Sequence, residues 1–133
     1  MKTIRVAAAV IEKDGRIMIA KRSYGEQAGL WEFPGGKYEK DEKGEETIVR
    51  EIREEFDARI AVDGFLCRIE HDYDSFHLLM DCYICHFLSD EVILHDHSDL
   101  KWIDPFDEDV EWVPADRKVI AEYRKRRCSY EQI

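Results

Sequence analysis

The stretch that decides the fold of this chain is Gly35–Phe56, GGKYEKDEKGEETIVREIREEF. Its second half carries apolar side chains at the spacing of an α-helix, which predicts a helix from about Glu42 to Phe56. These apolar residues would form one buried stripe against the rest of the protein. They are Ile48, Val49, Ile52 and Phe56.

Three carboxylates lie beside this stripe on the same helix. At about 100° per residue, Glu54 and Glu55 fall roughly −60° and +40° from Glu51, within one wedge. Like charges at i and i+4 cost about 0.2–0.5 kcal/mol, and Arg50 offsets part of this by reaching Glu54. A divalent ion would offset more, because Mg²⁺ is commonly held by one or two carboxylates together with phosphate oxygens. The wedge therefore predicts a Mg²⁺ site, and a solvated acidic helix face is the alternative.

The residues before this helix predict a close approach of backbone to a ligand. Pro34-Gly35-Gly36 ends a short apolar strand and should act as a stop. Glycine has no Cβ, so a carbonyl or an N–H group at this turn could approach a bound ligand closely.

The remaining pattern predicts an α+β protein in which a mixed β-sheet lies between helices. Asp14-Gly15 is a hairpin signal between two apolar runs. A second helix is predicted over Ala115–Arg127. Strands are predicted over Ile4–Ile11, Arg16–Ala20, Trp31–Phe33, Ile60–Arg68, Phe76–Phe87, Val92–His95 and Leu100–Ile103.

Composition restricts the classes of function. The 133 residues predict one domain, residues 1–133, and 44% hydrophobic content is enough for a buried core. The 20 Lys and Arg against 30 Asp and Glu leave a formal charge of −10, which disfavours binding to nucleic-acid polymers. No apolar run reaches the roughly 18 residues of a membrane span. We therefore expect a cytoplasmic protein with neither a nucleic-acid polymer nor a membrane as partner, as a monomer or homodimer.

Several other motifs are incomplete or weak. Neither a P-loop nor an H-E-x-x-H metalloprotease motif is present. Cys82 and Cys85 form C-x-x-C within a predicted strand, where a spacing of three points the thiols to opposite faces. The triplet His95-Asp96-His97 could ligate a metal, but surface histidines are the simpler interpretation.

The helical stretch resembles the Nudix box. The residues Gly36-x5-Glu42-x7-Arg50-Glu51-Ile52-x-Glu54-Glu55 match the pattern of this motif from its first glycine as far as Glu54-Glu55. The rest of the chain is similar to the CTP pyrophosphohydrolase-like members of the MutT branch, through AGLWEFPGGK, HDHSDLKW and Pro114-Ala115-Asp116. The box ends in Asp57 and Ala58 where the family has glycine and an apolar residue, so Asp57 would cap the helix in left-handed geometry.

The resemblance implies a Nudix fold and Mg²⁺-dependent hydrolysis of a nucleoside diphosphate linked to another group, with Mn²⁺ as a substitute metal. For the MutT branch the products would be a nucleoside monophosphate and pyrophosphate. Arg50 would orient the carboxylates, and Glu42 would support the loop or bind metal through water. The implied metal ligands are the Gly35 carbonyl, Glu51, Glu54 and Glu55. The implied catalytic residues are Arg50, Glu51, Glu54 and Asp96. The implied substrate-binding residues are Arg22, Glu32, Phe33, Pro34, Gly35, Lys37, Phe76 and Asp116.

Asp116 bears on the choice of base. The resembling MutT enzyme has an amide there, whereas an ionised carboxylate only accepts and suits the cytosine amino group. Protonated, it could donate to a purine. Phe33, Tyr73 and Phe76 are candidates to stack on the base, with core packing as the alternative, and Asp116 could instead be an N-cap. We expect cytidine-type triphosphates first and oxidised purine triphosphates, such as 8-oxo-dGTP, next. A non-catalytic nucleotide sensor and an interaction module are the competing classes.

Overall fold

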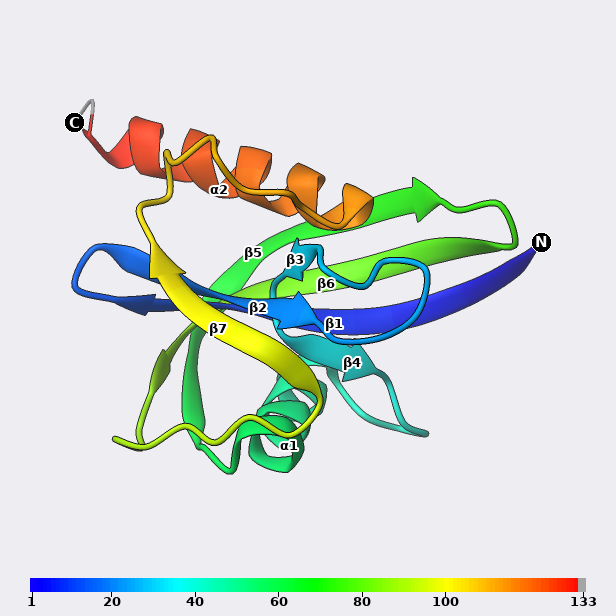
Figure 1. Cartoon of the computed structure of the whole chain (residues 1–133), viewed down its shortest axis with the longest axis horizontal. Helices are drawn as coiled ribbons and strands as arrows, with labels where there is room; N and C mark the ends of the chain where they lie inside the picture. The colour runs from blue at the N-terminus through cyan, green and yellow to red at the C-terminus, as the bar shows by residue number, and fades with distance from the viewer. Residues whose placement is uncertain (132–133) are drawn as a thin grey trace.

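The computed structural model describes residues 1–131, so the last two residues of the predicted domain lie outside the described part. Seven strands form one sheet and two helices pack on it (Figure 1). In chain order the elements are β1 Lys2–Lys13, β2 Arg16–Arg22, β3 Trp31–Glu32, β4 Gly35–Lys37, α1 Gly44–Phe56, β5 Ile60–Asp72, β6 Phe76–Phe87, β7 His97–Ile103 and α2 Pro114–Glu131.

The sheet is mixed, with β1 at its centre. The strand order is β3-β2-β1-β6-β5, while β4 pairs with β1 and β7 pairs with β2. β1 runs parallel to β6, and the other pairs are antiparallel. The predicted hairpin is confirmed, because Asp14 and Gly15 both have positive φ, at 52° and 78°, between β1 and β2. Such φ values match the right-handed twist of the flanking strands.

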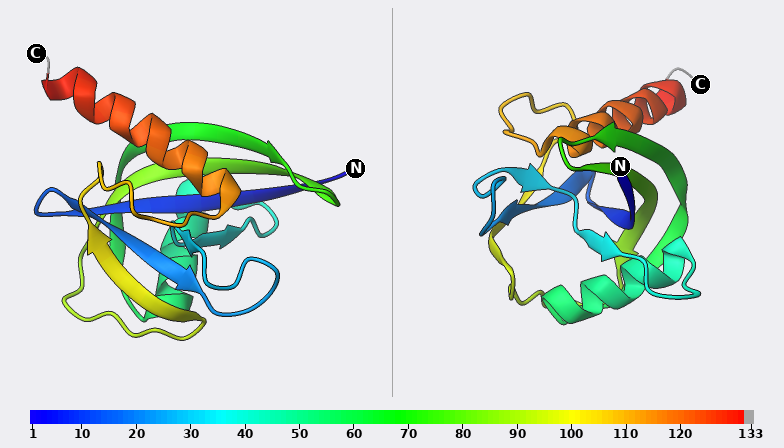
Figure 2. Two further views of the ribbon diagram at one scale, coloured as in Figure 1. Left: turned by 45° about the horizontal axis from the view of Figure 1, so that its top comes forward. Right: turned by 90° about the vertical axis from the view of Figure 1, so that its right-hand side faces the viewer.

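The two helices cover opposite faces of the sheet (Figures 1 and 2), which confirms the predicted architecture. Alternate residues of β1 enter two separate cores, since successive side chains of a strand point to opposite faces. Ala8 and Val10 join the core beneath α2, and Ala9 and Ile11 join the core against α1. Cys82 and Cys85 likewise belong to different cores, as their spacing predicted.

Helix α1 packs as predicted except at one residue. Ile48, Ile52 and Phe56 are fully buried, but Val49 is 38% exposed, so its place in the buried stripe was wrong. Val49 lies about 100° around the helix from Ile48, and the buried face extends the other way, through Gly44 and Thr47. Asp57 caps the helix with φ 52° and donates its N–H to the Arg53 carbonyl at 3.1 Å, as the resemblance implied.

Three predicted boundaries were wrong. Residues Val92–His95 are not a strand, because Ile93 donates its N–H to the carbonyl of Phe56 at 2.8 Å and this segment lies against the end of α1. The strand before Pro34-Gly35-Gly36 does stop, since β3 ends at Glu32, but Gly35 then begins the separate strand β4, which pairs with β1. α2 continues through the basic run to Glu131, and α1 starts at Gly44. Among residues 1–131, neither helix is long and apolar enough to cross a membrane.

Candidate active site

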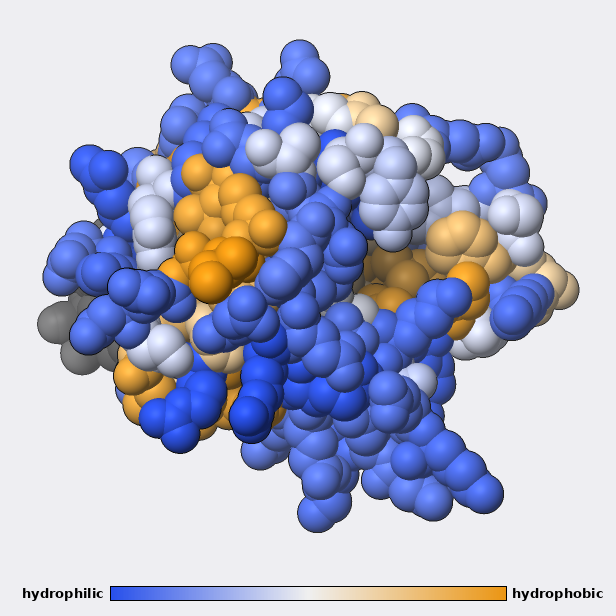
Figure 3. All heavy atoms as spheres, turned by 60° about the horizontal axis from the view of Figure 1, so that its bottom comes forward, coloured by the Kyte–Doolittle hydropathy of each residue, from blue (hydrophilic) through white to orange (hydrophobic). Residues whose placement is uncertain are grey.

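A cavity of about 310 Å³ gathers most of the site residues predicted from the sequence. Its walls come from β1, the loop after β2, β3 and β4, the end of α1, the turn after β5 and the start of β6, and the starts of β7 and α2. On the face in Figure 3, which is mostly hydrophilic, apolar residues are visible at the bottom of a hollow. The predicted residues lining the cavity are Arg22, Glu32, Phe33, Gly35, Lys37, Glu55, Tyr73, Phe76, Asp96 and Asp116.

The two glycines of β4 are required by packing. A Cβ at Gly35 would lie 2.0 Å from the Ala7 carbonyl oxygen on β1, and one at Gly36 would lie 2.3 Å from the carboxyl carbon of Glu51. Real Cβ atoms do not approach that closely, so a larger residue at Gly36 would displace Glu51. The missing Cβ atoms therefore serve strand pairing and the placement of the Glu51 carboxylate.

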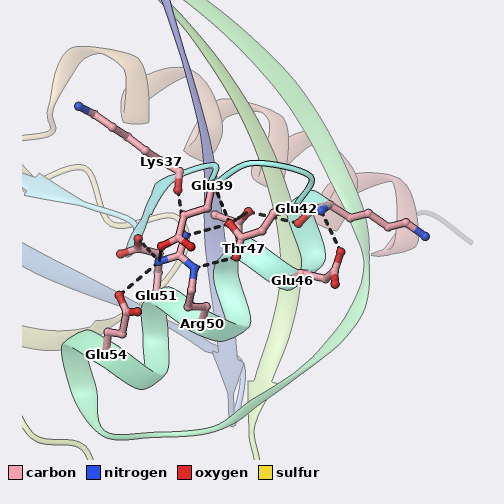
Figure 4. A network of polar contacts seen from close by, with 9 residues as sticks. Lys37, Glu39, Glu42, Glu46, Thr47, Arg50, Glu51 and Glu54 are labelled. Carbon is pink, nitrogen blue, oxygen red and sulfur yellow. Dashed lines mark hydrogen bonds and ion pairs between the residues drawn. The ribbon is translucent and has the colours of Figure 1, made fainter.

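Arg50 is the centre of a polar network that joins α1 to the loop before it (Figure 4). Its ion-pair partners are Glu39, Glu42, Glu51 and Glu54, at 3.3, 2.7, 2.8 and 3.2 Å. It also donates to the Lys37 carbonyl at 3.0 Å. The hydrogen bond from Arg50 lowers the pKa of Glu42 to about 2. Glu42 accepts as well from the Glu39 N–H at 2.8 Å, which matches the loop-supporting role that the resemblance implied.

The three carboxylates of the predicted wedge differ in burial. The side chains of Glu51 and Glu55 are 16% and 17% exposed, whereas that of Glu54 is 58% exposed. Glu51 and Glu55 lie about 60° and 20° from Ile48 around the helix, while Glu54 lies about 120° away. Glu54 therefore sits toward solvent, held by Arg50, and of the three carboxylates Glu55 alone lines the cavity.

Burial changes the protonation of the two inner carboxylates. Desolvation raises the pKa of Glu55 to about 7, with His97 opposing the shift and the charges of Glu51, Glu32 and Asp96 adding to it. Desolvation also raises the pKa of Glu51, against the hydrogen bond from Arg50. Perturbed carboxylates in a cavity are typical of functional sites.

A chain of partly buried side chains links Glu55 to Glu32 and Arg22 through His97. Arg22 lies 3.0 Å from Oε1 of Glu32, and Nε2 of His97 lies 2.9 Å from Oε2 of the same carboxylate. Nδ1 of His97 faces Oε2 of Glu55 at 3.7 Å. The interpretation of His97 as a surface histidine was wrong, since its side chain is 7% exposed. A histidine two positions from another gives no sequence signal of burial.

The far end of the cavity combines aromatic rings with one buried carboxyl group. Oδ2 of Asp116 accepts the N–H of Phe33 at 2.8 Å, and burial raises the pKa of Asp116 well above its ordinary value. Asp116 is the third residue of α2, so the N-cap alternative is wrong. The ring of Phe33 stacks on that of Trp112 with 5.1 Å between the ring centroids. The rings of Tyr73 and Phe76, at the cavity wall, also have their centroids 5.1 Å apart.

The remaining predicted residues have definite positions. Asp96 lines the cavity, and its carbonyl accepts a hydrogen bond from the Ser23 hydroxyl. Pro34 is fully buried behind the wall, where its carbonyl accepts the Ala9 N–H at 2.8 Å. Sequence reasoning missed the loop after β2, which contributes Ser23, Tyr24 and Gln27, since nothing in a glycine-containing loop signals its contact with a cavity.

The donor set suits a divalent metal. Oε2 of Glu55 is buried with no hydrogen-bond partner among residues 1–131, so it has an unused acceptor. Carboxylate oxygens are the ligands that Mg²⁺ prefers. The described side chains do not form a gathered group of three metal-binding residues, because Arg50 occupies Glu51 and Glu54. The predicted ligands therefore fit the metal in chemistry, and Arg50 is the present partner of two of them, Glu51 and Glu54.

Together these features define a class of protein. The cavity is lined by carboxylates, by Arg22 and Lys37, and by aromatic rings with a buried carboxyl group. An α+β protein with such a pocket is suited to a small ligand that has an anionic part and a flat polar ring.

The comparisons with known proteins agree with that class. The family profile described as NUDIX domain matches residues 6–122. The CTP pyrophosphohydrolase of Escherichia coli is 36% identical over 106 residues, 79% of this chain and 78% of that protein. The 8-oxo-dGTP diphosphatase of Proteus vulgaris is 33% identical over 85 residues, 62% of this chain and 76% of that protein. A crystal structure of a MutT NUDIX hydrolase from Burkholderia pseudomallei superposes with a TM-score of 0.83 at 29% identity, covering 92% of this chain and 98% of that one.

The chain therefore belongs to the NUDIX family, as a MutT-like nucleotide pyrophosphohydrolase. The predicted Nudix fold is confirmed. NUDIX hydrolases generally use divalent metals, which agrees with the carboxylate donors of α1.

Proposed function

We propose that this protein hydrolyses nucleoside triphosphates to a nucleoside monophosphate and pyrophosphate, preferring cytidine-type triphosphates that include modified dCTP. The observation that carries the proposal is the cavity itself, which is lined by Glu55 of α1, Arg22 and Lys37 as well as by Asp116 of α2. The similarity to a CTP pyrophosphohydrolase supports the choice of base. Such an activity would serve sanitation or balance of the nucleotide pool.

The phosphate end requires charge neutralisation and a positioned nucleophile. The Gly35 carbonyl, Glu51, Glu54 and Glu55 would hold Mg²⁺, which supplies charge neutralisation and lowers the pKa of water when bound. Arg22 and Lys37 would neutralise the phosphate chain from the cavity wall. Arg50 keeps Glu51 and Glu54 in place through its ion pairs. Glu51, Glu54 and Asp96 are the candidates to accept the proton of the attacking water.

The base end offers hydrogen bonding and stacking. Oδ2 of Asp116 is occupied by the Phe33 N–H, and Asp116 also lines the cavity. An acceptor there suits the cytosine N4 amino group, which is a donor. Phe76 and Tyr73 at the wall would stack on the base, a contact worth about 1–3 kcal/mol.

The test is a substrate panel with Mg²⁺ and identification of products by phosphorus NMR. The panel holds CTP, dCTP, 5-methyl-dCTP, 8-oxo-dGTP, GTP, ADP-ribose and a dinucleoside polyphosphate. We expect kcat/KM to be highest for the cytidine group, with pyrophosphate as the phosphorus product. Turnover of ADP-ribose or dinucleoside polyphosphates without turnover of the triphosphates would reject the proposal.

A second candidate substrate is an oxidised purine triphosphate. The raised pKa of Asp116 favours a neutral acid, which can donate to a purine carbonyl or ring nitrogen. The similarity to an 8-oxo-dGTP diphosphatase also supports it. An Asp116→Asn variant separates the two candidates, because an amide both donates and accepts. If the natural substrate is the purine, the variant keeps turnover of 8-oxo-dGTP, whereas a cytidine enzyme loses selectivity for CTP.

A further inference from the structure

His97 lies between two carboxylates of the cavity and is almost completely buried. Its side chain is 7% exposed, and its ring stacks on Phe56 of α1 at 5.6 Å between centroids. Nε2 lies 2.9 Å from Oε2 of Glu32, within hydrogen-bond distance. Nδ1 faces Oε2 of Glu55 at 3.7 Å, and neither atom has a hydrogen-bond partner among residues 1–131.

The segment that carries His97 is fixed to the C-terminal end of α1. Ile93 donates its N–H to the carbonyl of Phe56 at 2.8 Å, and Nε2 of His95 lies 3.0 Å from Oδ2 of Asp57. His97 follows at the start of β7, which pairs with β2 through Arg22. The imidazole is thus held rigidly by backbone on both sides, with α1 below it and β2 beside it.

We propose that His97 is a positioning residue that sets the Glu55 carboxylate for metal binding through Nδ1 and fixes Glu32, and through it Arg22, by Nε2. The inference rests on the proposed function. A flat ring with nitrogens at opposite edges can hold two carboxylates at a fixed separation. Glu55 projects from α1 and Arg22 from β2, so His97 couples the orientation of the metal end to that of the phosphate-binding arginine.

Two amide substitutions separate the two contacts. The amide of Asn in His97→Asn takes the place of Nδ1, and the amide of Gln in His97→Gln reaches toward Nε2. His97→Gln should therefore keep the contact with Glu32 and lose the one facing Glu55, while His97→Asn should do the reverse. His86→Gln is the matched control, since His86 is 47% exposed on β6 and does not line the cavity.

The first readout is the Mg²⁺ concentration that half-saturates the rise in Tm of the protein without nucleotide. Groups that orient metal ligands typically change metal affinity or activity by about 10–100-fold. We expect His97→Gln to raise this concentration at least tenfold, while His97→Asn and His86→Gln stay within twofold of wild type.

The second readout is steady-state kinetics with the best triphosphate of the panel. His97→Gln should lower kcat about 10–100-fold with little change in KM, whereas His97→Asn should mainly raise KM through Arg22. Equal loss in both variants with unchanged Mg²⁺ dependence would mean that His97 only supports packing, and the inference fails. If wild type itself shows neither a Mg²⁺-induced rise in Tm nor turnover, the proposed function fails instead.

Discussion

Asp116 places a carboxyl group in an apolar part of the molecule at the start of α2. Its Oδ2 accepts the Phe33 N–H at 2.8 Å, and this contact cannot be read from the sequence because the residues lie 83 positions apart. The resemblance drew attention to Asp116, but only packing shows that burial raises its pKa. The same holds for His97, whose role depends on carboxylates contributed by β3 and α1.

The raised pKa of Asp116 predicts a pH dependence of stability. The folded state holds this proton at pH values where the unfolded state, with an ordinary pKa of about 3.9, has lost it. The free energy of unfolding should therefore fall as pH rises above about 4, toward the raised pKa. Asp116→Asn keeps an acceptor for Phe33 without the charge, so its stability should fall less and exceed wild type at high pH. Urea unfolding at a series of pH values from about 4 to about 9 measures the free energy of unfolding of both proteins. If that free energy depends on pH in the same way in wild type and Asp116→Asn, the prediction is contradicted.

The two inner carboxylates of α1 predict a loss of activity without a loss of folding. Glu51→Gln and Glu55→Gln should each lower kcat/KM by about 10²-fold or more, the scale of losing a group that acts in proton transfer or charge stabilisation. Tm should stay level or rise, because each change removes a buried charge. Glu45→Gln, in the exposed first turn, is the control. Full activity of either inner variant would remove these carboxylates from the mechanism.

At the scale of elements, α1 was predictable because its apolar periodicity and the motif lie in one continuous stretch. β4 and the start of β7 were not, since each is defined by the strand it pairs with. Gly35 is in a strand only because it pairs with Ala8 of β1. Residues Val92–His95 have the composition of a strand, but they pack on the end of α1. Strand register is a tertiary property, which local composition does not encode.

The loop between β4 and α1 is tied to the sheet by Tyr38. Its hydroxyl donates to Oδ2 of the buried Asp81 at 2.6 Å, and Arg68 donates to Oδ1 at 2.7 Å. Tyr38→Phe leaves one carboxylate oxygen without this donor, which should lower the free energy of unfolding by about 1–3 kcal/mol.

Chemical denaturation measures the effect of Tyr38→Phe. Tyr24→Phe, at a residue that is 68% exposed, serves as the control and should change stability little. If Tyr38→Phe is as stable as Tyr24→Phe, the tie between this loop and β6 contributes nothing.

At the scale of the whole molecule, a protein with a net charge of −10 contains a site for an anionic ligand, which its overall charge would repel. The arrangement limits that repulsion by placing Arg22 and Lys37 in the cavity and by leaving Oε2 of Glu55 without a hydrogen-bond partner among residues 1–131, where a cation could bind it. Divalent metal should therefore stabilise the protein in a saturable way, as ligands of the folded state do. The α+β fold class could be predicted correctly from the sequence, because two amphipathic helices and alternating strands can pack in few other arrangements.

The central claim is that one cavity holds the phosphates at the α1 end and the base at the α2 end. A crystal structure with Mg²⁺ and a non-hydrolysable cytidine triphosphate analogue tests it most directly. We predict metal bound to Glu51 and Glu55, phosphates beside Arg22 and Lys37, and the cytosine amino group at Asp116. A nucleotide bound outside this cavity, or metal bound away from α1, would contradict the account.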